Sequence, residues 1–295
     1  MNNKLCDNEE IYLRLIEEEY SNQISRKNPS NSHEYIQKFR NDFALKVKQI
    51  LLEEKREQID LDVSIITSAE MNIGQKSGYD GTAIYLKYNN NKEELIIISQ
   101  GSQDFSDWEY NLKSMLSGIN LDQARSTYQF VSAVKDKFNL NTRTKVIGLA
   151  HSLAHNNNLS AHLTSNPTKT PLFNEIYSVN GAQTNYYQLY NNDDFFKTNI
   201  DQHFSQSFDT IYDLDPSELH DFAQEYYKDK IPVVNQRIST DDPLYALNTA
   251  RGFFQLGNVE YIDTNPDYPG LHSIMKKLPD DIVKDIQAIA IDYAT

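Results

Sequence analysis

The segment KVIGLAHSLAH at residues 145–155 constrains the fold of this chain more than any other stretch. Its apolar first half predicts a buried β-strand, and the residues after Ser152 predict a helix. A serine at such a corner sits on a sharp turn that exposes its hydroxyl above the sheet. Both flanking residues must be small, because the two backbones pass closely there. Ala150 and Ala154 meet this requirement, so the segment predicts a nucleophilic serine at position 152.

Short segments on both sides of this corner form a longer pattern in a fixed order. Upstream lie Gln100-Gly101-Ser102, Asp107-Trp108 and Asn111-Leu112, and downstream lie Asn180-Gly181-Ala182, Asp241-Asp242-Pro243 and Gly270-Leu271-His272. Together with His151-Ser152-Leu153 at the corner, residues 79–280 resemble the class 3 (fungal-type) lipases, a branch of the α/β-hydrolases. The chain departs from that pattern at three places. Gln100 replaces an arginine, Ala154-His155 replaces Gly-Gly, and Gly181-Ala182 replaces Ala-Pro.

This resemblance implies an α/β-hydrolase fold, with a mostly parallel central sheet flanked by helices. It also implies a serine carboxylester hydrolase of the lipase or phospholipase A type, without a cofactor or metal. Ser152 would be the nucleophile, His272 the base and Asp242 the acid. Asp241 is the alternative acid, since neighbouring side chains at a strand end point in opposite directions. The backbone N–H groups of Ser102 and Leu153 would form the oxyanion hole.

Contacts with the substrate are expected from two regions. His151 lies directly beside the nucleophile. Phe195 and Phe196 belong to an aromatic-rich insertion over residues 186–227, which could bind acyl chains or pack over the sheet. Residues 114–120 are a second, shorter candidate for a lid over the site.

The remaining sequence predicts one domain over residues 1–295, in which residues 1–60 form a helical extension. Two helices within residues 9–56 are expected to cover an edge of the sheet. Apolar runs predict a hairpin of strands and three later strands, and periodic residues predict two helices. The strands are expected at 82–88, 94–98, 175–179, 232–238 and 258–262, and the helices within 120–138 and from Pro279 onward.

Charge and cysteine content narrow the function classes. A net charge of −14 argues against nucleic acid as a partner, because binding phosphate requires clustered lysine and arginine. It also argues against electrostatic docking on anionic lipid, so a lipid or phospholipid substrate would be bound through apolar contacts. The single cysteine, Cys6, allows no intrachain disulfide.

The first ten residues lack the basic-then-apolar profile of a signal peptide, and no apolar run approaches the roughly 20 residues that span a bilayer. Together with the acidic, asparagine-rich composition, this is similar to the lipase toxins of Gram-positive type VII secretion. That general likeness implies secretion without an N-terminal signal peptide and action at membrane lipid. It also implies small helical secretion partners and an immunity protein. Without that route, a cytoplasmic location is expected.

Two other readings of the same residues stay open. His151 and His155 are spaced as in the zinc motif H-E-x-x-H, with His162 as a third ligand, although Ser152 stands where that motif has its glutamate. Alternatively, the alanines that flank Ser152 could mark a non-catalytic α/β-hydrolase scaffold that binds a partner protein. The first reading predicts a zinc hydrolase, and the second predicts no turnover.

Overall fold

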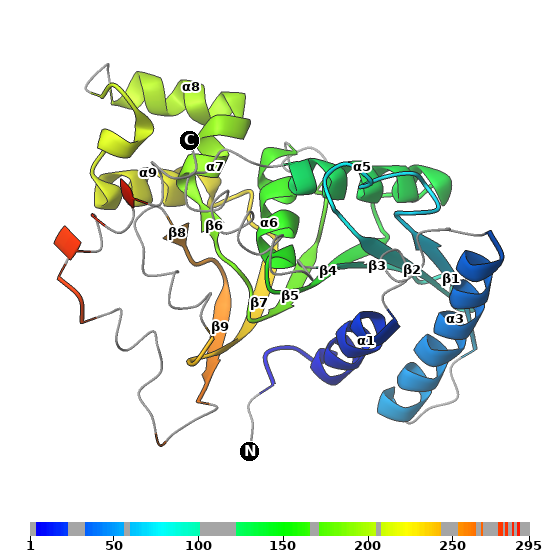
Figure 1. The fold of residues 1–295 in the computed structure, drawn as a ribbon. Coiled ribbons are helices and arrows are strands. Elements are labelled where there is room, and N and C mark those ends of the chain that lie inside the picture. Colours follow the sequence, from blue (N-terminus) through cyan, green and yellow to red (C-terminus); the bar gives the residue numbers. More distant parts are fainter. Residues whose placement is uncertain are drawn as a thin grey trace.

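The computed structural model describes residues 4–22, 33–55, 60–100, 122–165, 171–204, 208–242 and 253–263, together with residue 267 and short stretches between 277 and 289. Its centre is a seven-stranded sheet in the order β1-β2-β3-β4-β5-β7-β9 (Figure 1). The strands are β1 Leu61–Thr67, β2 Gly81–Tyr88, β3 Glu93–Ser99, β4 Lys145–His151, β5 Glu175–Val179, β7 Val233–Ser239 and β9 Asn258–Ile262. Strand β2 is antiparallel to its neighbours β1 and β3, and all pairs from β3 to β9 are parallel. The predicted mostly parallel sheet is therefore confirmed.

Strands β3 and β4 are buried along nearly their whole length, as expected for parallel strands covered on both faces. Because side chains alternate along a strand, each strand serves two cores. Ile97 and Val146 face one apolar cluster, whereas Ile98 and Leu149 face the other.

One face of the sheet is covered by α5 Asp122–Lys137 and α6 Ala154–Thr164, which connect consecutive parallel strands in the manner of an α/β fold. Residues 184–227 continue this layer beyond α6. They contain β6 Thr184–Asn185, α7 Tyr186–Asn192, α8 Asp194–His203, the 3-10 helix η1 Ile211–Asp213 and α9 Pro216–Tyr227. Strand β6 pairs with β8 Phe253–Phe254 in a separate two-stranded sheet.

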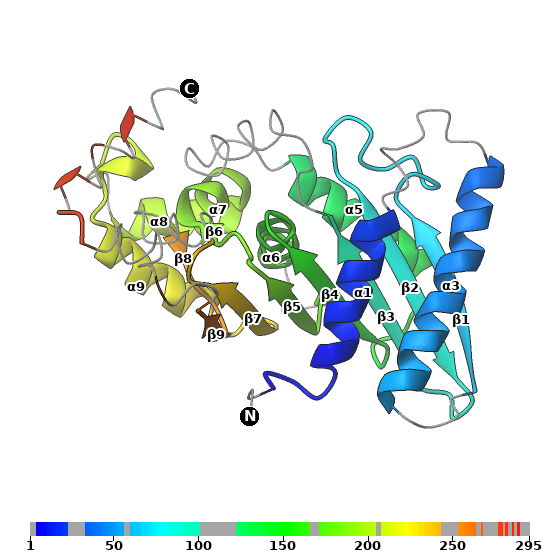
Figure 2. The ribbon, with the colours of Figure 1, turned by 60° about the horizontal axis from the view of Figure 1, so that its bottom comes forward.

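The opposite face is covered by α1 Glu9–Asn22 and α3 His33–Lys55 (Figure 2). Both helices were predicted at the edge of the sheet. Helix α3 does pack on the edge strand β1, whereas α1 lies over the central strands β3 and β4. Their apolar residues pack against side chains of five strands, including Leu149 of β4 and Tyr177 of β5. Without α1 and α3 this face of the sheet would be exposed, so the N-terminal residues supply one of its covering layers.

The predicted strands and the helix before β4 are confirmed, and the described residues among 281–289 are helical, as the sequence predicted from Pro279 onward. Strand β1 was not predicted. Over the described part of the chain, no helix combines the length and the apolar character needed to cross a bilayer.

Candidate active site

Ser152 occupies the corner between β4 and α6 in a left-handed backbone conformation, with φ of +57°. Few residues other than glycine adopt this conformation, and it costs on the order of 1–3 kcal/mol where the surrounding structure imposes it. Three backbone hydrogen bonds hold the corner. Ser152 N–H donates to the Val179 oxygen at 3.2 Å, and the Ser152 oxygen accepts from Ala182 N–H at 3.0 Å and His155 N–H at 3.1 Å. The strained turn expected of an exposed nucleophile is present at this position.

Close packing at the corner explains the small residues around Ser152. Ala150 and Ala154 are both fully buried. Gly181, which lies on the loop after β5, is pressed against the first turn of α6. A methyl group placed on it would lie 2.7 Å from both Cβ and Cγ of His155. The larger residue at 155 is thus accommodated by the absence of a side chain at 181.

We expect Gly181→Ala to lower the free energy of unfolding by about 1–3 kcal/mol, because neither backbone can move away from the clash easily. Combining it with His155→Gly removes the opposing atoms, so the double variant should lose less stability than the sum of the two single variants. Urea denaturation of the four proteins measures this coupling. Strictly additive losses would show that the two positions do not compete for the same space.

Helix α6 is buried on all sides although three asparagines follow one another in it. Asn156 donates to the Gln183 carbonyl and to the Gln188 side chain, each at 2.8 Å. The Ser99 hydroxyl donates to Asn158 Oδ1 at 2.8 Å. These bonds tie the helix behind the corner to β3 and to the loop after β5, and they fix the direction in which Ser152 is presented.

His151 points to the face of the sheet that α1 covers. Its ring meets the Tyr20 ring edge-on, with centroids 5.1 Å apart. Burial lowers the pKa of His151, and the negative charge of Asp242 partly offsets this effect. The imidazole is therefore neutral at neutral pH, and Asp242 lies within electrostatic reach of the residue next to Ser152.

The turn after β7 carries both candidate acids. Asp241 N–H donates to the Ser239 hydroxyl at 3.3 Å, and Asp242 N–H donates to the Ser239 carbonyl at 3.1 Å. Of the two aspartates, it is Asp242 whose charge acts on His151. Which of the two aspartates acts as the acid stays a prediction.

The other predicted site residues are distributed as follows. Leu153 is the N-cap residue of α6, directly after the nucleophile candidate, and it is buried. His272 and Ser102 lie outside the described residues, as do residues 114–120. Phe195 is 72% exposed on α8, whereas Phe196 is fully buried against Tyr226 and Tyr227 of α9. That packing accounts for Phe196 without a substrate, so its contact with an acyl chain stays a prediction.

The zinc reading is not supported by the geometry of its three histidines. His162 Nδ1 accepts the Phe173 N–H at 3.1 Å, and Nε2 lies 2.8 Å from the Lys230 carbonyl, so neither nitrogen is left for a metal. His155 is fully buried within α6, while His151 lies on the other face of the sheet. Within the described ranges, no three histidine, cysteine or acidic residues gather as a metal site would require.

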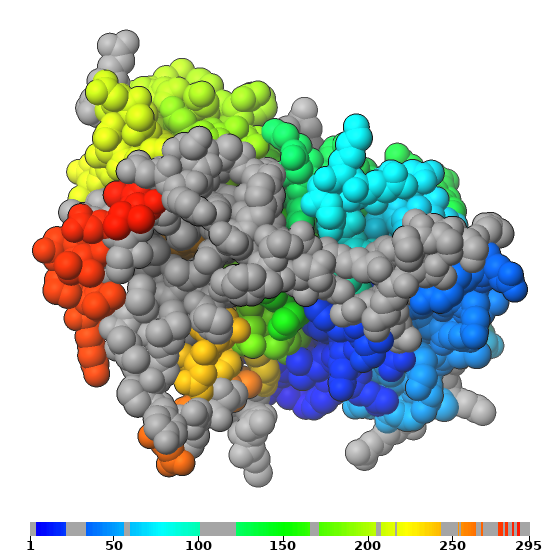
Figure 3. All heavy atoms as spheres, viewed as in Figure 1, coloured from blue at the N-terminus to red at the C-terminus, as the bar shows by residue number. Residues whose placement is uncertain are grey.

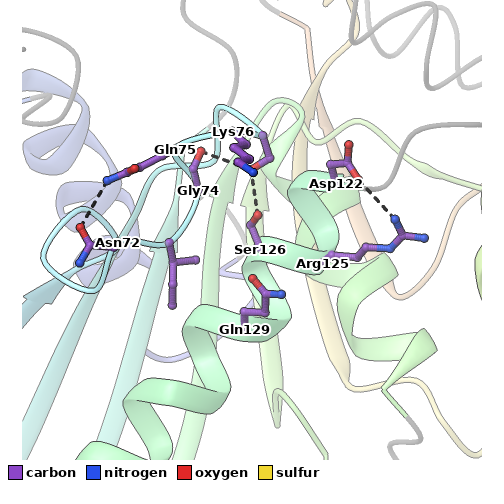
Figure 4. Close-up of a pocket in the computed structure, with 10 residues that line it drawn as sticks. Asn72, Gly74, Gln75, Lys76, Asp122, Arg125, Ser126 and Gln129 are labelled. Carbon is purple, nitrogen blue, oxygen red and sulfur yellow. Dashed lines mark hydrogen bonds and ion pairs between the residues drawn. The ribbon is translucent and has the colours of Figure 1, made fainter.

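Two cavities flank the outer face of α5, away from the corner. One, of about 420 Å³, lies between the loop after β1 and the first turns of α5 (Figure 4). Lys76 of the loop and Arg125 of α5 line it, and the loop stands out at the surface (Figure 3). The second, of about 490 Å³, shares Arg125 and reaches Thr164 at the end of α6. Ser152, His151 and Asp242 line neither cavity.

Similarity to known proteins extends over nearly the whole chain. A family model described as "Domain of unknown function (DUF6792)" matches residues 10–263. The protein YvcB of Bacillus subtilis (strain 168) is 33% identical over 305 aligned residues, which cover 99% of this chain and 47% of YvcB. The chain therefore spans about half the length of that relative.

Solved structures similar to this chain include lipases and esterases. M37 lipase superposes with a TM-score of 0.47 at 12% identity, covering 97% of this chain and 98% of the lipase. Carboxyl esterase 2 of Tuber melanosporum gives a TM-score of 0.35 at 13% identity, covering 81% and 90%. An esterase of Pyrobaculum calidifontis gives 0.29 at 15% identity, covering 93% and 98%. The α/β-hydrolase fold of this chain is recognised from its own features: a mostly parallel sheet in which β4 is followed by a serine in the left-handed conformation and then by a helix.

Proposed function

We propose that this chain, which belongs to the DUF6792 family, is a serine carboxylester hydrolase of the lipase or phospholipase A type. The observation that carries the proposal is the left-handed conformation of Ser152 at the end of β4. This strained conformation holds the serine hydroxyl clear of the sheet, where a nucleophile must be. A serine with a purely structural role does not need this conformation.

The proposed reaction uses the triad and the oxyanion donors that the resemblance to class 3 lipases implies. His272 takes the proton of the Ser152 hydroxyl while the oxygen attacks the ester carbonyl, and Asp242 orients the imidazole. The N–H groups of Leu153 and Ser102 stabilise the oxyanion of the tetrahedral intermediate. The imidazolium then protonates the departing alcohol, leaving an acyl ester on Ser152. Water attacks this ester, with His272 again as the base, and releases the fatty acid.

The proposal is tested with the purified chain and two lipids. Fatty acid release from phosphatidylcholine and from triolein identifies the substrate class. A fluorophosphonate probe forms a covalent adduct only with an activated serine, and peptide mass analysis locates it. We expect fatty acid release and one adduct, on the peptide that contains Ser152. Absence of both from the folded protein would favour the non-catalytic scaffold.

The acid is identified by a matched pair of variants. Asp242→Asn keeps the shape of the side chain but removes its charge, and such a change in a catalytic triad typically lowers kcat by about 10⁴-fold. Asp241→Asn should leave kcat within a few-fold of wild type. Steady-state kinetics on p-nitrophenyl butyrate compares the two. The reverse pattern would assign the role to Asp241.

A finer proposal concerns the biological setting. The chain would act on membrane lipid as a type VII-secreted toxin, with small helical secretion partners and an immunity protein. Its support is the acidic, asparagine-rich composition. Growth arrest of cells exposed to the wild type but not to Ser152→Ala would support this role. Equal growth in both cultures, despite lipid hydrolysis in vitro, would argue against it.

A further inference from the structure

The loop between β1 and β2 is folded back against the start of α5. Gly74 has a φ of +91°, and a methyl group placed on it would lie 2.1 Å from the Tyr79 carbonyl oxygen, so only glycine fits there. The Gly78 N–H closes the turn on the Gly74 oxygen at 2.9 Å. The hydroxyls of Ser77 and Ser126 lie 2.8 Å apart and join the loop to α5. The loop is therefore fixed as one wall of the cavity of about 420 Å³, and α5 forms the other wall (Figure 4).

Arg125 and Gln129 of α5 line both this cavity and the neighbouring one of about 490 Å³. We call the two adjoining cavities the α5 groove. Two hydrogen bonds hold the guanidinium of Arg125, since Nη1 donates to Asp122 Oδ1 at 3.3 Å and Nη2 donates to Asn192 Oδ1 at 3.2 Å. Tyr128, which is 46% exposed, adds an aromatic surface to the second cavity. Each cavity falls within the range of about 300–1,000 Å³ that is typical of pockets for small ligands.

The α5 groove carries more positive than negative charge, although the net charge of the whole chain is −14. Its charged lining residues are two cations, Lys76 and Arg125, and one carboxylate, Asp122. Lys76 and Gln129 make no hydrogen bond or ion pair within the part of the chain that the structure describes. Lys76 belongs to the loop wall and Arg125 to the helix wall, so the two cations line the first cavity from opposite sides. An anion with oxygens on several sides would contact both.

We propose that the α5 groove binds the phosphate group of a phosphate ester, with Lys76 and Arg125 as its ionic contacts and Gln129 as a neutral donor. Hydrogen bonds from ammonium and guanidinium groups to phosphate oxygens are shorter and stronger than those between neutral groups. A tetrahedral phosphate offers oxygens to both walls of the cavity. The two oxygens of a carboxylate lie in one plane and are matched by a single arginine. Tyr128 contacts the carbon skeleton of the ester.

The α5 groove is distinct from the proposed site of ester hydrolysis, because Ser152, His151 and Asp242 line neither of its cavities. The inference therefore goes beyond the proposed function, and it is tested by binding rather than by turnover. A water-soluble phosphate ester and phosphatidic acid in a membrane present the same phosphate monoester. The experiment includes both sources.

Isothermal titration calorimetry measures the Kd of sn-glycerol 3-phosphate for the wild type, Lys76→Gln and Arg125→Gln. Lys87→Gln is the matched control, since Lys87 is an exposed lysine of β2 that lines neither cavity. Losing one charge-assisted contact should weaken binding about tenfold in each groove variant, and Lys87→Gln should bind like the wild type. Glycerate, which carries a carboxylate and no phosphate, should bind about tenfold more weakly or less. Lys76 and Arg125 are both exposed, so their variants are expected to fold.

Cosedimentation with phosphatidylcholine vesicles, with and without phosphatidic acid, tests the lipid source. It uses the Ser152→Ala background, in which the proposed hydrolysis does not consume the lipid. Binding of glycerol phosphate identifies a soluble ester, and binding of the phosphatidic acid vesicles alone identifies a lipid headgroup. A folded wild type that binds neither probe, binds glycerate as tightly, or keeps its affinity in both groove variants contradicts the inference. A chain that binds phosphate but hydrolyses no ester contradicts only the proposed function.

Discussion

Replacing Ser152 with alanine is expected to lower kcat for p-nitrophenyl butyrate by on the order of 10⁴ to 10⁶-fold, since loss of the nucleophile removes the acyl-enzyme route altogether. The left-handed φ of +57° at this position makes a further prediction about stability. Alanine carries the same backbone strain as serine, so the free energy of unfolding should hardly change. Activity and stability are thus expected to separate in this variant.

Ser160 provides the matched control for Ser152. It lies in α6, the helix that follows Ser152, is fully buried, and its hydroxyl has no hydrogen-bond partner within the described part of the chain. Ser160→Ala should therefore retain kcat within a few-fold of wild type. Both variants can be assayed for turnover and for fluorophosphonate labelling. Labelling that persists in Ser152→Ala would mean that another serine is the nucleophile.

The sequence allowed the centre of the fold to be predicted because its signals there are local. The apolar run that forms β4 ends directly at Ser152, and the helix before it shows a three-four periodicity around Val131 and Val134. The corner itself was predicted for the same reason, since small residues on both sides of a serine are a local requirement.

Features that depend on distant residues could not be predicted in this way. The asparagines of α6 would be expected on a surface, but Asn156 and Asn158 are buried because their partners come from other strands and loops. The placement of α1 depends on contacts across the whole sheet. Strand β1 lies outside the segment that resembles lipases, and its pairing with β2 is visible only in three dimensions.

One of these distant contacts explains why Gln100 stands where the class 3 lipase pattern has an arginine. Its partner, Glu19, is a buried acid that is neutral at neutral pH, and an uncharged amide satisfies such a group without requiring it to ionise. An arginine at this position would favour the charged form of Glu19. The sequence shows the substitution at position 100, but only the fold shows which residue it faces.

Removing the guanidinium of Arg237 by Arg237→Leu is expected to lower the free energy of unfolding by about 3–5 kcal/mol, because a buried carboxylate is left without its cation. Glu9, at the start of α1, accepts hydrogen bonds from Arg237 Nη2 at 2.8 Å, the Tyr177 hydroxyl at 2.8 Å and the Leu5 N–H at 3.0 Å. Burial by itself would raise the pKa of Glu9, but the bonds from Arg237, Tyr177 and Leu5 outweigh it, and the pKa is lowered. Arg237 also pairs with Glu260 of β9 at 2.8 Å.

Two further variants show whether burial of the pair between Arg237 and Glu9 causes this loss of stability. Arg14→Leu removes an arginine of α1 itself, but its partners Glu53 and Glu54 on α3 are on the protein surface, so little stability should be lost. The double variant Glu9→Leu/Arg237→Leu removes both buried charges and should recover part of the loss. Urea denaturation compares the variants, and equal losses for Arg237→Leu and Arg14→Leu would refute the explanation.

The pH dependence of this contact has a definite sign. Because the pKa of Glu9 is lowered in the folded protein, its stabilising contribution is present above about pH 4.5 and is lost as the pH falls below it. Glu19, on the same helix, has a raised pKa and its contribution is lost in the opposite direction, as the pH rises from about 4.5 to about 8. Glu9 and Glu19 therefore stabilise the packing of α1 on the sheet in different pH ranges. For Glu9→Gln and Glu19→Gln, the difference in unfolding free energy from the wild type should change with pH in opposite directions. Parallel curves for the two variants would contradict the opposite pKa shifts assigned to Glu9 and Glu19.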